Sequence, residues 1–161
     1  MTLLERFPGV TFYAADKVEI QEDVEIGPGS RVGTFVVILK GSRIGRDCTI
    51  GSFVHIAGAQ IGDRVSIQTN VHVTRHTTVE SDVFLGPGVV TTNDKQMDGQ
   101  ELKGPFIGAH SRIGAGAILL PVRIGTHVVV GAGAVVNKPV ANGVVVAGVP
   151  ARLLHSQGSH A

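Results

Sequence analysis

The sequence has few of the residues that most globular proteins use to build and lock a core. It contains no Trp, one Tyr, six Phe and one Cys in 161 residues. A single cysteine cannot form an intramolecular disulfide, and in an apolar segment it is usually a small core residue, so Cys48 is given no role. Val and Ile dominate the apolar residues and there are 22 Gly, which favours a narrow β-structured interior over a helical bundle.

The sequence also lacks an excess of one charge and a long hydrophobic run. Fourteen basic and thirteen acidic residues give a net charge of +1, and they are scattered along the chain. No basic stripe indicates a nucleic-acid partner. The first ten residues, MTLLERFPGV, include Glu5 and no apolar run long enough for a signal or membrane segment. We therefore expect a cytoplasmic protein with no nucleic-acid or membrane partner.

What the sequence does have is an aliphatic residue at every sixth position. Neither a helix nor a hairpin has this period, whereas a short strand followed by a turn does. Gly often follows the aliphatic residue directly, which allows a bend or a close neighbour. One repeat alone cannot bury its aliphatic side chain. Stacked repeats can, because they form continuous parallel ladders with about 4.8 Å between successive layers, so the sequence predicts a β-solenoid. The aliphatic positions are Ile20, Ile26, Val32, Ile38, Ile44, Ile50, Ile56, Ile61, Ile67, Val73, Val79, Leu85, Ile107, Ile113, Leu119, Ile124, Val130 and Val136.

Irregular spacings indicate three repeats per coil, hence a triangular prism. Counting in threes predicts that one face holds Ile20, Ile38, Ile56, Val73, Thr91, Leu119 and Val136, and that the next holds Ile26, Ile44, Ile61, Val79, Ile107 and Ile124. Both five-residue steps, from 56 to 61 and from 119 to 124, then fall at the corner between these two faces. The 16-residue step from 91 to 107 falls there as well.

That long step includes the polar, turn-rich stretch TTNDKQMDGQELKG at 91–104. An insertion at a corner leaves the stacked faces intact, so we predict one projecting loop near 92–106. Long loops on rigid scaffolds commonly carry function, although a tolerated surface insertion is the alternative. We expect one domain over 1–161, with repeats and a closing segment at 15–154 and a flexible tail at 155–161.

Three segments make the chain resemble the left-handed parallel β-helix hexapeptide-repeat acyltransferases. They are VFLGPGVVTTND (83–94), IGAGAILLPVRIGTHVVVGAGAVVNKPV (113–140) and VVVAGVPARLL (144–154). IQTNVHV followed by VFLGPGVVTTND is most similar to bacterial nucleotide-sugar N-acetyltransferases that act on 3-amino sugars. The resemblance implies a homotrimer, acetyl-CoA as co-substrate in a groove between prisms, a nucleotide-sugar acceptor and no metal.

The same resemblance directs attention to candidate cofactor contacts. IGAGAI and VGAGAV lie 17 residues apart and hence on successive coils, where small residues expose backbone groups to the thin pantetheine arm. Ala115 and Ala132 are the predicted corner contacts, although Gly-Ala corners also suit tight turns. Lys138 and Arg152 are predicted to meet the phosphates, Arg through its fork of donors, or else to be ordinary solvated side chains.

For the acceptor, related sugar O-acetyltransferases carry a His in this loop because a hydroxyl needs a general base. The loop here has none. A neutral amine is already a nucleophile, so a neutral positioning group can suffice. The resemblance to amino-sugar N-acetyltransferases implies that Asn93 is the residue that holds the reacting amine, and Asp94 could favour a cationic amine by its charge; the alternative for both is turn chemistry. By resemblance to some amino-sugar acetyltransferases, His76 is the candidate general base, the alternative being an exposed corner residue. His72 is a candidate for substrate binding.

Other functions remain open from the sequence. His55 and His72, and His110 and His127, are each 17 residues apart, and such stacking allows a zinc site like that of the γ-class carbonic anhydrases. That family needs two His five residues apart within one coil, and no such pair occurs. The further alternatives are O-acetylation of a sugar or other small acceptor, and a non-catalytic binding scaffold.

Overall fold

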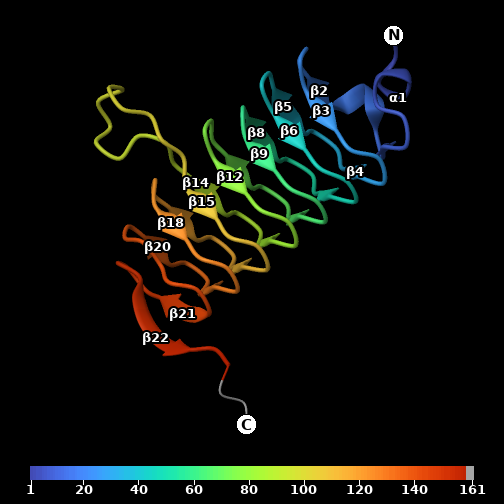
Figure 1. The fold of residues 1–161 in the computed structure, drawn as a ribbon. Coiled ribbons are helices and arrows are strands. Elements are labelled where there is room, and N and C mark those ends of the chain that lie inside the picture. The colour runs from blue at the N-terminus through green and yellow to red at the C-terminus, as the bar shows by residue number, and fades with distance from the viewer. Residues whose placement is uncertain (159–161) are drawn as a thin grey trace.

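Parallel pairing between very short strands organises the chain, and the structure, a computed structural model, describes residues 1–158. The chain winds through three sheets in turn, and each coil adds one strand to each sheet. Figure 1 shows the coils stacked in sequence order from the N-terminal helix to the C-terminal hairpin. The predicted all-β parallel β-helix is confirmed, with about eight coils.

The nine-stranded sheet runs the whole length of the stack. Its strands are parallel except for the last, which pairs antiparallel with its neighbour. In order it contains β1 (Thr11–Phe12), β4 (Arg31–Val32), β7 (Thr49–Ile50), β10 (Ser66–Ile67), β13 (Phe84–Leu85), β16 (Arg112–Ile113), β19 (Val129–Val130), β21 (Val144–Ala147) and β22 (Arg152–Ser156).

The seven-stranded and six-stranded sheets form the other two walls of the prism. The seven-stranded sheet contains β2 (Glu19–Ile20), β5 (Val37–Leu39), β8 (His55–Ala57), β11 (His72–Val73), β14 (Val90–Thr91), β17 (Ile118–Leu119) and β20 (Val135–Val136). The six-stranded sheet contains β3 (Glu25–Ile26), β6 (Arg43–Ile44), β9 (Gln60–Ile61), β12 (Thr78–Val79), β15 (Phe106–Ile107) and β18 (Arg123–Ile124).

The two faces predicted by counting in threes are these two sheets, residue for residue. Ile38 pairs with Ile56 and Ile56 with Val73 in the seven-stranded sheet, and Val79 pairs with Ile107 in the six-stranded sheet. The second residue of nearly every strand points into the prism and is buried, because adjacent side chains on a strand face opposite sides. The core is therefore a stack of Val, Ile and Leu layers.

Polar groups inside the corners are paired between coils. Ser111 is fully buried, and its hydroxyl donates to the carbonyl of Gly125 (2.9 Å) and accepts from the N–H of Val128 (3.1 Å). Ser30 makes the equivalent pair of bonds, to Gly45 and from Cys48. Such bonds satisfy polar groups that would otherwise be costly to bury.

The two ends of the stack are closed differently. At the N-terminus, helix α1 (Leu3–Arg6) begins with a capping box between Thr2 and Glu5, and Phe7 after it is 4% exposed against the first coil. A 3₁₀ turn, η1 (Ala15–Lys17), follows β1. At the C-terminus the β21–β22 hairpin covers the last coil (Figure 1).

Two predicted boundaries need correction. The coils begin at β1, whose Thr11 pairs with Arg31, so they start before residue 15. Residues 155 and 156 belong to β22, which pairs with β21, so they are not part of a flexible tail. Residues 159–161 of the predicted tail lie outside the described residues. No helix among the described residues is long and apolar enough to cross a membrane.

Candidate active site

The projecting loop joins β14 to β15 at the corner between the seven-stranded and six-stranded sheets, and Figure 1 shows it extending well away from the stack. A hollow of about 580 Å³ lies where the loop leaves the coils. Its lining includes His72 and Thr74 from one coil, and Asn93 and Asp94 from the start of the loop. Three of the predicted site residues, Asn93, Asp94 and His72, therefore meet at one place.

Three threonines anchor the start of this loop. Thr91 is the only polar residue at an inward position of the seven-stranded sheet, and its hydroxyl accepts from the N–H of Thr74 (2.8 Å). The hydroxyls of Thr74 and Thr77 lie 3.0 and 3.2 Å from it. Thr77 and Thr91 are at most 1% exposed. The cluster therefore holds Thr91, which lies two residues before Asn93, against the previous coil.

Asp94 has a structural function within the loop. Its carboxylate accepts hydrogen bonds from the N–H groups of Gly99 (2.7 Å) and Asp98 (3.3 Å), one at each oxygen. The bond from Gly99 is the main reason that the pKa of Asp94 lies below its ordinary value. The turn chemistry considered for this residue is thus present, and its charge also lies at the hollow.

Asn93 is held at the mouth of the hollow by the closure of the loop. Its backbone carbonyl accepts a hydrogen bond from the N–H of Lys103 (2.9 Å), which brings the two ends of the loop together. The exit of the loop packs directly against the previous coil, since a Cβ added to Gly104 would lie 2.3 Å from the His76–Thr77 peptide. The position of Asn93 therefore depends on the backbone at both ends of the loop.

The two histidines on the seven-stranded sheet stack as their spacing predicts. The rings of His55 and His72 are 4.7 Å apart with an interplanar angle of 24°. Burial, with a smaller contribution from His55, lowers the pKa of His72. Nδ1 of His55 is buried without a hydrogen-bond partner among the described residues. A group of three or more His, Cys, Asp or Glu able to hold a metal does not occur within residues 1–158.

His76 occupies a different position from the other candidates. It sits at the turn between β11 and β12 with φ of +69°, and its side chain is exposed. It is not among the residues that line the hollow. The structure brings the loop exit against its backbone instead. A role as base therefore stays a prediction.

The predicted cofactor contacts lie on another edge of the prism. Ala115 and Ala132 occupy the corner between the nine-stranded and seven-stranded sheets on successive coils, and both are exposed. Their N–H groups have no acceptor among residues 1–158. Gly116 and Gly133 follow them with φ of +69°, and a Cβ added at either would meet nothing within 4 Å. This corner presents bare backbone, which suits a thin ligand with amide groups.

Lys138 and Arg152 lie near the C-terminal end, where they line a second hollow of about 370 Å³. This hollow is formed by the last coil together with the β21–β22 hairpin. Its lining does not include Ala115 or Ala132. The structure therefore brings the two basic residues together and does not join them to the alanine corner within one chain.

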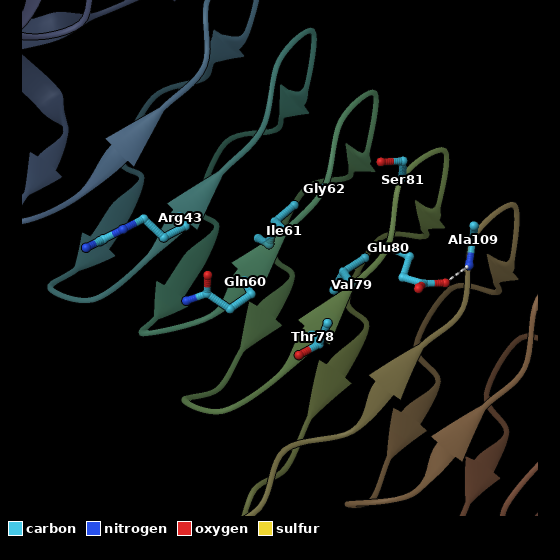
Figure 2. Close-up of a pocket in the computed structure, with 9 residues that line it drawn as sticks. All are labelled: Arg43, Gln60, Ile61, Gly62, Thr78, Val79, Glu80, Ser81 and Ala109. Carbon is cyan, nitrogen blue, oxygen red and sulfur yellow. Dashed lines mark hydrogen bonds between the residues drawn. The ribbon is translucent and has the colours of Figure 1, made fainter.

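A further hollow, on the outer face of the six-stranded sheet, has its charged groups already paired. Figure 2 shows Arg43 at one end of it and Glu80 at the other. Arg43 contacts Asp23 (2.9 Å) and Glu25 (3.2 Å), and Glu80 accepts from the N–H of Ala109 (2.8 Å). We therefore place no site here. Cys48 is fully buried, and burial raises the pKa of its thiol, in agreement with a structural residue.

Comparison with known families defines the class of protein. A model of bacterial transferase hexapeptide (six repeats) matches residues 23–58 and 41–75, and a model of the hexapeptide repeat of succinyl-transferase matches 106–138. Together these matches cover more than half of the chain. The chain belongs to the hexapeptide-repeat transferases.

Individual relatives agree with this assignment. The chain is 30% identical to the bifunctional protein GlmU of Streptococcus pyogenes over 79% of its own length, but spans about a quarter of that relative (27%). The acetyltransferase domain of PglB from Neisseria gonorrhoeae, solved with acetyl coenzyme A, matches with 26% identity and a TM-score of 0.61 over 91% of this chain and 58% of that one. The hexapeptide-repeat acetyltransferase VCA0836 from Vibrio cholerae, also solved with acetyl coenzyme A, matches with 25% identity and a TM-score of 0.61. The match covers 74% of this chain and 72% of that one.

Proposed function

We propose that the protein is an acetyl-CoA-dependent N-acetyltransferase that acts on a nucleotide-linked amino sugar and works as a homotrimer. The observation that carries the proposal is the hollow at the loop, where Asn93 and Asp94 meet His72 and no histidine is present in the loop itself. An amine acceptor suits this arrangement because, once neutral, it needs no base to attack. The nucleotide-sugar class rests on the sequence similarity of IQTNVHV (67–73) and VFLGPGVVTTND (83–94).

The reaction follows from the groups at the two corners. The side-chain oxygen of Asn93 accepts a hydrogen bond from the neutral amine and aims its lone pair at the thioester carbonyl. The C–N bond forms as the carbonyl becomes an oxyanion, which a backbone N–H such as that of Ala115 stabilises. The C–S bond then breaks and coenzyme A leaves as a thiolate. The amine nitrogen loses its proton to water or to His76, and a proton from solvent or from His76 converts the thiolate to the thiol.

The homotrimer is supported by the positions of the two half-sites. Ala115 and Ala132 lie at one edge of the seven-stranded sheet, and Asn93 lies at the opposite edge. One prism therefore keeps the proposed cofactor and acceptor contacts apart by the width of a sheet. A neighbouring copy that places its alanine corner beside this loop would complete the site, as a cyclic assembly does. Light scattering should give three chains per particle, and a stable, fully active monomer would contradict the intersubunit site.

The activity is tested with acetyl-CoA and a panel of nucleotide amino sugars, using thiol release as the readout. Asn93→Ala should lower kcat at every pH from 6 to 9 by a similar factor, because an amide does not titrate. Loss of one transition-state hydrogen bond is worth on the order of 2 kcal/mol, or about thirtyfold. Gln96→Ala is the matched control, since Gln96 is an amide of the same loop that does not line the hollow.

Two results would contradict the proposal. Near wild-type kinetics for Asn93→Ala with an active amino-sugar substrate would mean that the loop does not position the acceptor. Faster thiol release with the matching hydroxyl sugars than with the amino sugars would identify an O-acetyltransferase instead. Chelator treatment should leave acetyl transfer intact, whereas loss of activity that added zinc restores would favour the metal-dependent alternative.

A further inference from the structure

Two phenylalanines form an exposed stack on the N-terminal half of the prism. Phe35 and Phe53 lie on successive coils, at the corner between the nine-stranded and seven-stranded sheets. Their ring centroids are 5.2 Å apart with an interplanar angle of 16°, and they are 53% and 56% exposed. Large apolar rings are normally buried, so this pair requires an explanation outside the packing of one chain.

The backbone at these positions makes the choice of phenylalanine more unusual. Phe35 and Phe53 have φ of +53° and +59°, in the left-handed region that disfavours bulky side chains. The equivalent turns of the following coils have Asn70, Gly88 and Gly116, residues that adopt this conformation readily. Strained residues of this kind tend to mark functional sites. The protein thus carries two exposed rings where its own later coils use Asn or Gly.

One face of the stack opens onto a hollow. Phe53 comes from the coil after Phe35 and Lys17 from the coil before it, so they lie on opposite sides of the Phe35 ring; Lys17 Nζ is 5.9 Å from its centroid. A hollow of about 360 Å³ beside Phe35 is lined in part by Lys17, Asp16 and Glu19. An aromatic platform with one cation and two carboxylates beside it can bind a flat group with N–H donors and an attached anion.

The position of the stack along the solenoid relates it to the proposed reaction. Ala115 and Ala132 lie on coils C-terminal to the loop, Asn93 lies at the level of β14, and Phe53 and Phe35 lie two and three ladder steps further toward the N-terminus. Those steps correspond to about 10 and about 14 Å along the axis. The stack shares its edge of the seven-stranded sheet with Ala115 and Ala132 and lies on the opposite edge from Asn93. In the proposed trimer, the neighbouring copy that brings its alanine corner beside the loop also brings its stack, so an acceptor whose amine meets the thioester near Asn93 would extend its other end toward the neighbour's stack. A ribose diphosphate linker can bridge such a separation.

From these observations we infer that Phe35 and Phe53 are the stacking platform for the base of the nucleoside diphosphate carried by the acceptor. The inference rests on the proposed function and assigns residues to the part of the substrate that does not react. Bases stack on aromatic side chains regardless of their identity, because every base has a π-face. Lys17 lies on the N-terminal side of the platform, where its ammonium can donate to a carbonyl at the edge of the base.

The test measures nucleotide binding by calorimetry with uridine, thymidine and guanosine diphosphates, and with pyrophosphate as the baseless control. Wild type should bind at least one nucleoside diphosphate more tightly than pyrophosphate. The Phe35→Asn/Phe53→Asn double variant should weaken that binding by roughly fivefold to more than a hundredfold, the range for loss of base stacking, and leave pyrophosphate binding unchanged. Its melting temperature should stay the same or rise, since Asn tolerates positive φ. Leu154→Asn, at an exposed apolar residue of β22, is the control and should change neither.

Three results would overturn the inference: equal binding of pyrophosphate and all three nucleotides by wild type, unchanged nucleotide affinity in the double variant, or conversion of the double variant to a smaller oligomer. The last would make the rings a contact between copies. Acetyl transfer to free amino sugars is measured in parallel on wild type. Acetyl transfer to amino sugars, together with nucleotide binding no tighter than pyrophosphate binding, would refute the platform and leave the proposed function standing. Absence of acetyl transfer to every amino sugar, free or nucleotide-linked, would refute the proposed function itself.

Discussion

Replacing Thr91 by Val tests whether the buried threonine cluster holds the projecting loop in place. Thr91 is 1% exposed, and the replacement keeps its shape while removing the acceptor for the Thr74 N–H, which lies 2.8 Å away. A buried donor left without a partner costs about 1–3 kcal/mol. The methyl group that replaces the hydroxyl recovers about 0.8 kcal/mol by burial. The expected net loss in unfolding free energy is therefore about 0.2–2.2 kcal/mol, with a central value of about 1 kcal/mol.

This loss is measured by thermal unfolding at fixed protein concentration. For a chain of this size each kcal/mol corresponds to roughly 2–4 °C, so the melting temperature should fall by roughly 2–4 °C at the central value and by at most about 9 °C. Thr92→Val is the matched control: Thr92 is the next residue, half-buried, with one 3.3 Å contact to the carbonyl of Leu119. Thr92→Val is expected to change the unfolding free energy by less than about 0.5 kcal/mol.

A double-mutant cycle with Thr77 sharpens the test. The hydroxyls of Thr77 and Thr91 lie 3.2 Å apart inside the prism, so Thr77→Val and Thr91→Val remove the same contact. The double variant should lose less stability than the sum of the single variants, by about 0.5 kcal/mol or more. Additive losses would show that the hydroxyls do not act together. A rise in melting temperature for Thr91→Val would refute the reasoning altogether.

Three further predictions concern the loop and the histidines. Gly104→Ala should displace the exit of the loop, because its Cβ would lie 2.3 Å from the His76–Thr77 peptide of the preceding coil, and should reduce acetyl transfer more than melting temperature. If His76 is the base, His76→Ala should lose activity most near neutral pH and recover partly at pH 9, where the amine loses its own proton; a flat profile would contradict this role. The lowered pKa of His72 means that the unfolded chain binds more protons than the folded one below the ordinary value of 6.5, so stability should fall on acidification through that range. The fall is the difference in unfolding free energy between pH 7 and pH 5, measured by urea titration. His72→Gln should make this difference smaller, and the control His127→Gln should leave it unchanged. An equal difference in wild type and His72→Gln would exclude His72 as the cause.

Much of the site could be located before any side chain was placed. The insertion at 92–106 interrupts the regular repeat at a corner, which predicts the projecting loop, and Asn93 within it is predicted from the resemblance to amino-sugar N-acetyltransferases. Thr91 also carried a signal, since it is a polar residue at a position where the same face otherwise has aliphatic residues. Its partners Thr74 and Thr77 could not be recognised, because the direction of a side chain at a turn depends on local φ and ψ.

The sequence by itself determined the coils, the register of the sheets and the corner that bears the loop. A strand of two residues has one inward position, and only an aliphatic side chain there can contribute to the core, so the spacing of those residues specifies the winding. The tertiary structure decided which polar groups meet. In the structure the carboxylate of Asp94 holds the loop, and His72 lies at the hollow while His76 lies outside it. These outcomes depend on backbone closure between segments distant in the chain, which no local pattern encodes.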